Sequence, residues 1–159
     1  MSTTTRETAI TADPAVPTIL ITREFDAPVA NVFRAHVDPD LVRRWLGPRR
    51  LEMDIHRWDC ETGGGYRYTH RDENGEYGFY GSFHEVRENE RIVQTFTFDG
   101  WPDGVSLETM RFIDLGDGRT RLEALSVFDS MGARDGMLSS GMDTGVIQAF
   151  EQLDELLAE

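Results

Sequence analysis

"WDCETGGGYRYTHRD", residues 58–72, decides between two very different folds, because three consecutive glycines precede a run in which aromatic and polar residues alternate. A phosphate-binding loop has Gly-x-x-x-x-Gly-Lys-Ser/Thr or Gly-x-Gly-x-x-Gly spacing between a strand and a helix. Neither spacing is present, no lysine follows, and the alternation after the glycines is typical of a strand. The glycines therefore predict a hairpin turn and a sharp bend in the following strand.

Further strand-like runs lie before and after this stretch, and turn-forming residues separate them. Short separators favour an antiparallel meander, because parallel pairs need long crossover connections. The predicted strands cover residues 18–25, 51–60, 64–71, 77–86, 91–98, 105–115 and 120–128.

Three segments have the spacing of helices instead. Two short helices are predicted within 26–39 and 39–47, and one long amphipathic helix over 138–157. The fold class is therefore α+β. A seven-stranded antiparallel sheet must cover one apolar face, and a twisted sheet that curls around the long helix can leave a cavity between them.

Gly141 and Gly145 lie four residues apart, on one face of the predicted long helix. Glycine inside a helix costs about 1 kcal/mol relative to alanine. Two explanations stay open at this point. Either another segment approaches the helix closely here, or the missing side chains leave room for a ligand.

The composition limits the class of protein. With 159 residues the chain is expected to form one domain, residues 18–159, after a flexible tail, residues 1–17. A net charge of −13 argues against nucleic acid and anionic membranes as partners. The single cysteine, Cys60, excludes an internal disulfide. No signal peptide or membrane span is recognised, so a cytoplasmic location is expected.

Several blocks together resemble the AHSA-type family, the homologues of the heat-shock ATPase activator within the START and birch-pollen-allergen-like (SRPBCC) superfamily. They are "FDAPVANVFRAHVDPDLVRRWLGP", "DCETGGGYRY", "GSFHEVRENERIVQTF", "RFIDLGDGRTRLE" and "ARDGMLSSGMDTGVIQAFEQLDELL". The resemblance covers residues 18–157 and implies a helix-grip fold, in which a curved seven-stranded sheet grips a long C-terminal helix around a cavity. The chain departs from the family at Leu46, where a second tryptophan is common, and at Glu61, where arginine is common.

Candidate ligand contacts follow from the alternation on two strands. Tyr66, Tyr68 and His70 share one face of their strand, and Tyr80 lies on the next strand. Their hydroxyl and imidazole groups could orient a ligand or transfer a proton, so His70 and Tyr68 are the catalytic candidates. They could equally be core residues with satisfied polar tips. Further ligand-binding candidates are Trp45, Trp101 and Met142.

Three functions are compatible with this sequence. We favour a module that binds an apolar or aromatic small molecule between the sheet and the long helix. The second is a polyketide cyclase-like enzyme, which needs only positioned proton transfers and a shaped cavity. The third is a chaperone-interacting protein, which rests on family analogy. No cofactor and no metal site is expected, since the four histidines have no metal-binding spacing. A homodimer is compatible with the sequence.

Overall fold

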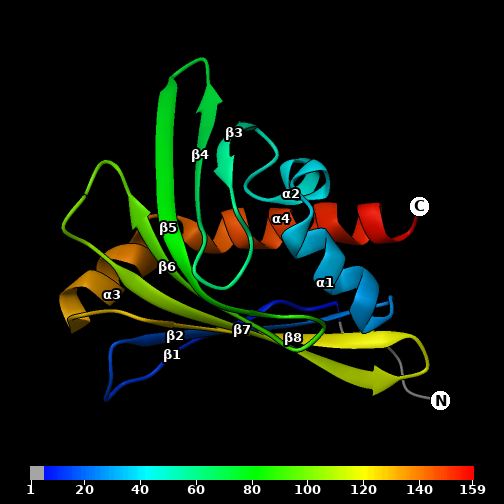
Figure 1. Ribbon diagram of the computed structural model, residues 1–159. Coiled ribbons are helices and arrows are strands. Elements are labelled where there is room, and N and C mark those ends of the chain that lie inside the picture. Colours follow the sequence, from blue (N-terminus) through cyan, green and yellow to red (C-terminus); the bar gives the residue numbers. More distant parts are fainter. Residues whose placement is uncertain (1–5) are drawn as a thin grey trace.

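The computed structural model describes residues 6–159 and shows one antiparallel sheet that curls around a helix (Figure 1). The strand order is β1-β2-β8-β7-β6-β5-β4-β3. The strands are β1 (Ala9–Ala12), β2 (Thr18–Phe25), β3 (Glu52–Trp58), β4 (Gly65–Asp72), β5 (Gly75–Arg87), β6 (Arg91–Phe98), β7 (Ser106–Gly116) and β8 (Arg119–Val127). The helices are α1 (Val29–Val37), α2 (Pro39–Trp45), α3 (Met131–Ser139) and α4 (Met142–Leu157).

The sheet has eight strands, so the prediction of seven is wrong by one. The additional strand is β1, which pairs antiparallel with β2 from Ala9 opposite Thr22 to Ala12 opposite Ile19. It lies inside the segment that we interpreted as a tail. Its four residues are mostly exposed, so they carry no alternation that would distinguish a strand from a tail in the sequence.

The predicted long C-terminal helix is two helices, because Gly141 interrupts it. Gly141 has a φ of +88°, a left-handed conformation that glycine adopts without a steric penalty, and it is the N-cap residue of α4. Gly145 lies inside α4, and an added Cβ there would contact Pro48 at 3.8 Å. This is an ordinary van der Waals distance, so the contact with Pro48 does not by itself require glycine at position 145.

The three glycines after Trp58 form the turn into β4, as predicted. Gly63 has a φ of +87°. A Cβ at Gly64 would lie 2.0 Å from the Asp59 carbonyl oxygen, and a Cβ at Gly65 would lie 3.1 Å from that of Gly81. The positive φ at Gly63 and the close backbone approach at Gly64 and Gly65 together explain why consecutive glycines stand at this bend.

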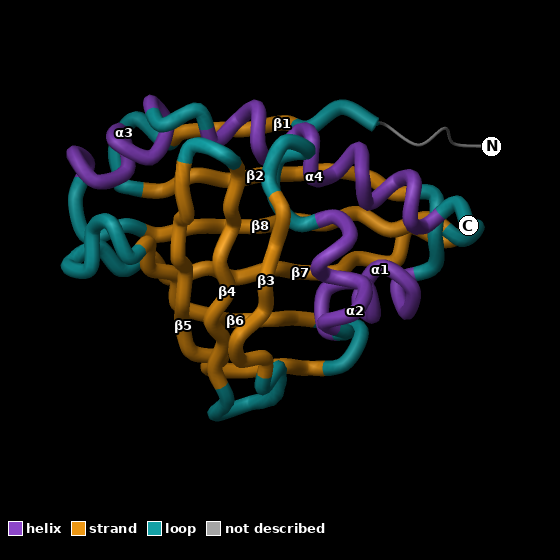
Figure 2. The backbone as a smooth tube through the Cα atoms, turned by 90° about the horizontal axis from the view of Figure 1, so that it is seen from above, coloured by secondary structure: helices purple, strands orange, loops and turns teal. Residues whose placement is uncertain are grey.

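The helices cover the concave face of the sheet unevenly (Figure 2). At one end, α1, α2 and the second half of α4 meet the sheet, and the core there is sealed. Its residues are at most 6% exposed: Phe25, Val32, Phe33, Trp45, Phe112, Leu122, Phe150 and Leu153. At the other end, α3 and the first turns of α4 lie near the ends of β2 and β8 (Figure 1).

Candidate functional site

The inward side of β4 carries Tyr66, Tyr68 and His70, which are 3%, 6% and 5% exposed. The three rings follow one another along the strand, with ring centroids 6.0 Å apart for the tyrosines and 5.1 Å apart for Tyr68 and His70. The predicted shared face is confirmed. It is the inner face, because Tyr66 and Tyr68 belong to the hydrophobic core.

Tyr66 reaches across one strand to the next. Its hydroxyl donates a hydrogen bond of 2.6 Å to the Thr95 carbonyl oxygen on β6, although Tyr66 is on β4. Gly81 on β5 lies between them, and a Cβ at this position would be 2.7 Å from the Tyr66 hydroxyl oxygen. The absence of a side chain at Gly81 therefore lets the phenol cross β5.

Three polar side chains form a row across the inner face of neighbouring strands. Gln94 on β6 pairs with Glu108 on β7, and Glu108 pairs with Ser126 on β8. The Gln94 amide donates to Glu108 Oε1 at 2.9 Å, and the Ser126 hydroxyl donates to Glu108 Oε2 at 3.4 Å. Gln94 Nε2 also lies 3.4 Å from the Tyr66 hydroxyl, which links the row to β4.

Glu108 is the chemically distinctive member of this polar row. Burial raises the pKa of its carboxyl group, and the hydrogen bonds from Gln94 and Ser126 only partly oppose this. No arginine, lysine or histidine forms an ion pair with Glu108 within residues 6–159. Burial raises the pKa of Tyr66 and Tyr68, and the negative charge of Glu108 raises it further. The Gln94 amide, 3.4 Å from the Tyr66 hydroxyl and 2.9 Å from Glu108 Oε1, links the carboxylate to the Tyr66 phenol.

The polar row borders the less completely covered part of the concave face, which we call the open end. Except for Ser106, which is 4% exposed, its inner-face residues are only partly buried, unlike the sealed core at the other end. They are Gln94, Phe96, Glu108, Met110 and Ser126, with Phe98 at the rim. The Tyr68 hydroxyl makes no hydrogen bond within the described chain. Its oxygen atom is not fully buried, so it keeps some contact with solvent.

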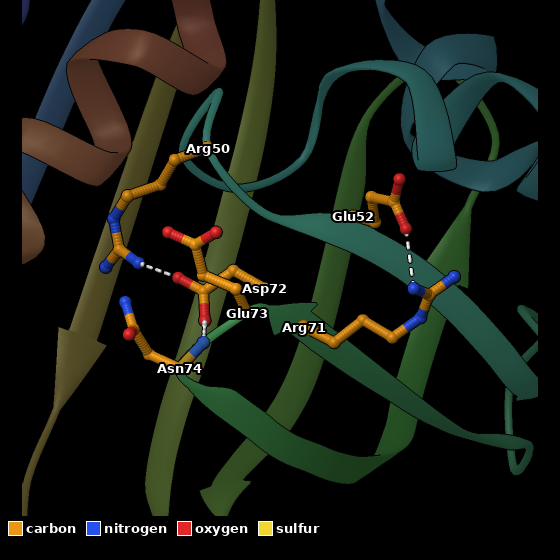
Figure 3. A pocket seen from close by; sticks show the side chains of 6 residues that line it. All are labelled: Arg50, Glu52, Arg71, Asp72, Glu73 and Asn74. Atoms are coloured by element: carbon orange, nitrogen blue, oxygen red, sulfur yellow. Dashed lines mark hydrogen bonds and ion pairs between the residues drawn. The ribbon is translucent and has the colours of Figure 1, made fainter.

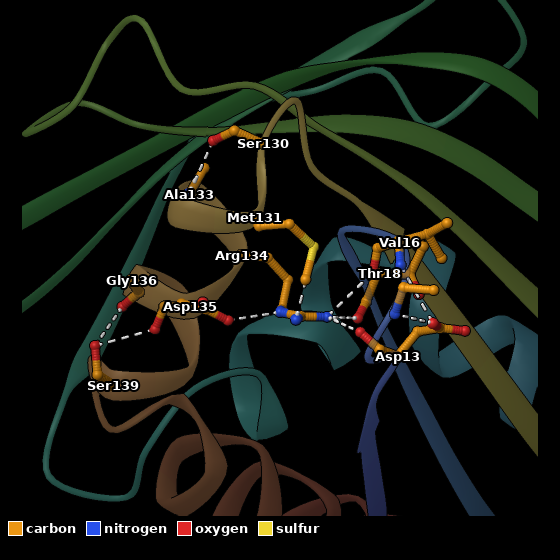
Figure 4. Close-up of polar contacts among 11 residues, drawn as sticks. Asp13, Val16, Thr18, Ser130, Met131, Ala133, Arg134, Asp135, Gly136 and Ser139 are labelled. Atoms are coloured by element: carbon orange, nitrogen blue, oxygen red, sulfur yellow. Dashed lines mark hydrogen bonds and ion pairs between the residues drawn. The ribbon is translucent and has the colours of Figure 1, made fainter.

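Helix α3 borders the open end and is fixed in place by one arginine (Figure 4). Arg134 is 4% exposed, and its Nη1 donates to the carbonyl oxygens of Asp13, Val16 and Thr18 at 2.8, 3.2 and 2.9 Å. Thr18 pairs with Val127 at the end of β8, next to Ser126. Arg134 therefore ties α3 to the β1–β2 turn beside the polar row.

Among the described residues, His70 and Tyr80 make no hydrogen bond with the polar row of Gln94, Glu108 and Ser126. A Cβ at Gly47 would lie 2.6 Å from His70 Cε1, so His70 packs against the loop after α2, and its Nδ1 is buried without a partner among the described residues. Burial also lowers the pKa of His70. Tyr80 points to the outer face, where the Arg67 guanidinium lies 4.8 Å from its ring centroid. The structure therefore does not bring Tyr80 together with Tyr66, Tyr68 and His70 as we had expected.

The remaining candidates lie in three different environments. Trp45 is a core residue, because its Nε1 donates to the Ala35 carbonyl oxygen at 2.8 Å and its ring stacks on Phe150. Trp101 is 59% exposed in the loop between β6 and β7. Met142 is partly buried at the first residue of α4. Met142 and the loop that carries Trp101, which follows Phe98 directly, border the open end, whereas Trp45 does not.

A separate hollow of about 760 Å³ lies on the surface beside the β4–β5 turn (Figure 3). It is lined by Arg50, Glu52, Arg71, Asp72, Glu73 and Asn74. Its charges neutralise one another, since Arg50 pairs with Asp72 at 2.8 Å and Arg71 with Glu52 at 2.6 Å. Most of the charged groups that line this hollow are therefore already paired with each other.

Metal and thiol chemistry find little support in the described residues. Within residues 6–159, no group of three or more histidine, cysteine, aspartate or glutamate side chains is arranged to hold a metal ion. Burial raises the pKa of the Cys60 thiol to about 12, which favours the protonated, less nucleophilic form. In the same part of the chain, no helix is long and apolar enough to span a membrane.

The sequence reading missed Gln94, Glu108 and Ser126, although one signal for Glu108 was present. Met110 and Phe112 point inward, and strand alternation places position 108 on the same face. A charged residue in phase with core residues is unusual. The pairing with Gln94 and Ser126 depends on strand register, which alternation within one strand does not give.

Together, the curled antiparallel sheet, the helix it surrounds and the partly covered inner face define a helix-grip protein. The family model for "Activator of Hsp90 ATPase homolog 1-like protein" matches residues 26–158, and the chain belongs to this family. Among curated proteins, none matches the chain significantly.

Solved structures from three bacteria share the fold. Protein Ms6760 from Mycobacterium smegmatis has a TM-score of 0.85 and 25% identity, over 95% of this chain and 97% of its own. A protein from Arthrobacter aurescens has a TM-score of 0.86 and 25% identity, over 94% of this chain and 91% of its own. A protein from Rhodobacter sphaeroides has a TM-score of 0.84 and 24% identity, over 94% and 97%.

Proposed function

We propose that this protein binds a small molecule with an apolar or aromatic body at the open end of the concave face. The observation that carries the proposal is the contrast between the two ends of that face. One end is sealed by side chains at most 6% exposed, whereas the other keeps aromatic rings and polar groups partly uncovered. Apolar walls with a few convergent polar groups are typical of ligand sites.

Native mass spectrometry of the purified protein, followed by thermal-shift screening of apolar and aromatic compounds, tests this proposal. A ligand that binds only the folded state raises the melting temperature. The variant Ser126→Phe fills the open end and is expected to abolish the shift. Ser82→Phe is the matched control, since Ser82 is exposed on β5 and its backbone N–H bonds to Thr95 on the outer face. Equal shifts in both variants would contradict the proposed location.

The same samples test for catalysis. Tyr68 shares the inner face of the sheet with Glu108, a partly buried carboxylate whose pKa is raised, and acid–base enzymes use groups of this kind. Conversion of the bound compound, detected by mass spectrometry and lost in Tyr68→Phe, would assign a cyclase-like activity instead of simple binding.

A chaperone partner is the second candidate, and an exposed apolar surface on the convex face favours it. This surface comprises Val105, Leu107, Leu125 and Val127, which are 37–50% exposed. The family's name refers to activation of the Hsp90 ATPase. Stimulation of that ATPase by the wild-type chain, lost in Leu107→Asp, would support this function, and no stimulation would exclude it.

A further inference from the structure

We infer that the ligand of the open end carries a protonated amine, which forms an ion pair with Glu108. This inference rests on the proposed function and specifies its ligand class. The geometry that points to it is a carboxylate on the inner face of the sheet, for which residues 6–159 provide hydrogen-bond donors but no ion-pair partner.

The hydrogen bonds at Glu108 identify it as an acceptor. Both of its oxygens receive donors, Oε1 from the Gln94 amide and Oε2 from the Ser126 hydroxyl. A carboxylate offers about four acceptor positions, so two donors leave it incompletely satisfied. The Ser126 contact is also long, at 3.4 Å. A ligand group with several N–H donors could use the acceptor positions of Glu108 that Gln94 and Ser126 leave free.

The charge balance at the site points the same way. A buried charge without a partner is costly, and an ion pair with a ligand removes that cost. Two buried arginines of the described chain already have other partners. Arg23 forms an ion pair with Asp154, and Arg134 donates to backbone carbonyl oxygens. A cation beside Glu108 would favour its ionised form and so oppose the effect of burial, which raises the pKa of this carboxyl group.

The surroundings of Glu108 also favour a cation. The Gln94 amide lies between Glu108 and the Tyr66 hydroxyl on the same inner face, and aromatic faces attract cations. The whole chain has 29 acidic and 16 basic residues, so its field attracts cationic molecules. A neutral or anionic ligand gains from neither feature.

The test compares three compounds with one aromatic body: naphthylmethylamine, naphthylmethanol and naphthoate. Calorimetry at neutral pH is expected to show that the amine binds at least about tenfold more tightly than the alcohol, and that naphthoate binds most weakly. In Glu108→Gln the amine is expected to lose this preference while the alcohol keeps its affinity. Glu123→Gln on the outer face of β8 is the matched control and keeps the preference.

The possible failures are distinguishable. Equal binding of amine and alcohol, or a preference that survives in Glu108→Gln, would overturn the amine inference and leave the proposed function standing. No binding of any of the three compounds would overturn both. A second readout avoids reliance on the variant: in the wild type, acidification is expected to weaken binding of the amine and not of the alcohol.

Discussion

Arg23 on β2 and Asp154 on α4 are 131 residues apart in sequence and form a paired, fork-like contact, with Nη1 to Oδ1 at 3.1 Å and Nη2 to Oδ2 at 2.5 Å. The Arg23 side chain is 3% exposed, and its guanidinium also lies 4.9 Å from the Phe25 ring centroid. The contact joins the long helix to β2 over the sealed core. Removing either partner would leave the other as an unpaired charge with little exposure to solvent.

Asp154→Ala is therefore expected to lower the free energy of unfolding by about 3–5 kcal/mol, because it leaves a buried guanidinium without its counter-charge. Urea denaturation followed by circular dichroism measures this. Glu151→Ala, an exposed residue of the same helix, is expected to change stability by less than about 0.5 kcal/mol. Similar losses in the two variants would refute the special role of the Arg23 pair.

His36 gives the fold a pH dependence in acid. It is buried, its Nδ1–H donates to the Val32 carbonyl oxygen at 2.8 Å, and burial lowers its pKa to about 4. Because the unfolded chain takes up the proton near pH 6.5, the stability from neutral His36 is complete above about pH 6.5. It is lost as the pH falls from there toward 4, by about 3 kcal/mol in total.

Denaturation of the wild type and His36→Gln across this range checks the prediction for His36. The variant is expected to be less stable at neutral pH and to lose less stability on acidification. An unchanged slope between about pH 6.5 and 4 would show that another group causes the acid sensitivity.

Glu108 is expected to give the free energy of unfolding the opposite pH dependence to that of His36. Its folded-state pKa is raised, so its contribution to stability is present in acid, below the ordinary pKa of a glutamate, and is lost as the pH rises through the folded-state value. Glu108→Gln removes the buried charge. Its free energy of unfolding should exceed that of the wild type at neutral pH, and the difference should close in acid. Glu123→Gln should show no such gain.

Two glycines test the argument about backbone crowding. Gly64→Ala is expected to destabilise the protein by about 1–3 kcal/mol, because the new Cβ would meet the Asp59 carbonyl oxygen at 2.0 Å. Gly136→Ala in α3 is the matched control, since nothing lies within 4 Å of its added Cβ. It should stabilise the protein by up to about 1 kcal/mol through helix propensity. Thermal unfolding of both variants decides the point.

Arg134 is predicted to hold the β1–β2 turn. Arg134→Met keeps an unbranched, space-filling side chain but removes three hydrogen bonds to backbone carbonyls, so a loss of about 2 kcal/mol or more is expected. Hydrogen exchange should accelerate in β1 and at the start of β2. Arg34→Met, whose side chain is 72% exposed, should leave exchange in that turn unchanged. Equal protection in both variants would contradict the role of Arg134.

Much of the fold could be predicted because periodicity reports which side of an element is buried. The alternation Tyr66, Tyr68, His70 correctly gave one inward face, and turn residues located the strands. Strand β1 was not predicted because its residues are mostly exposed and show no alternation of buried and exposed positions. The break between α3 and α4 escaped because apolar spacing continues through Gly141, and only its positive φ ends the helix.

The candidate site was less predictable because it depends on contacts between strands. Tyr80 was assigned together with residues of β4, but register places it opposite Arg67 on the outer face. His70 shares its strand with Tyr68, yet its ring packs against Gly47. Glu108 has no partner within its own strand, and its neighbours become apparent only when β6, β7 and β8 are aligned.

The direct pairing of Gln94, Glu108 and Ser126 also determines which changes in chain length this protein can tolerate. Side chains alternate sides along a strand, so one residue inserted in β7 before Glu108 would turn its carboxylate out to solvent and a neighbour inward. An insertion in the loop around Trp101 leaves the strand pairs unchanged. Relatives that differ in length at this loop can therefore keep the same interior chemistry, whereas a single-residue insertion or deletion within β7 would replace it.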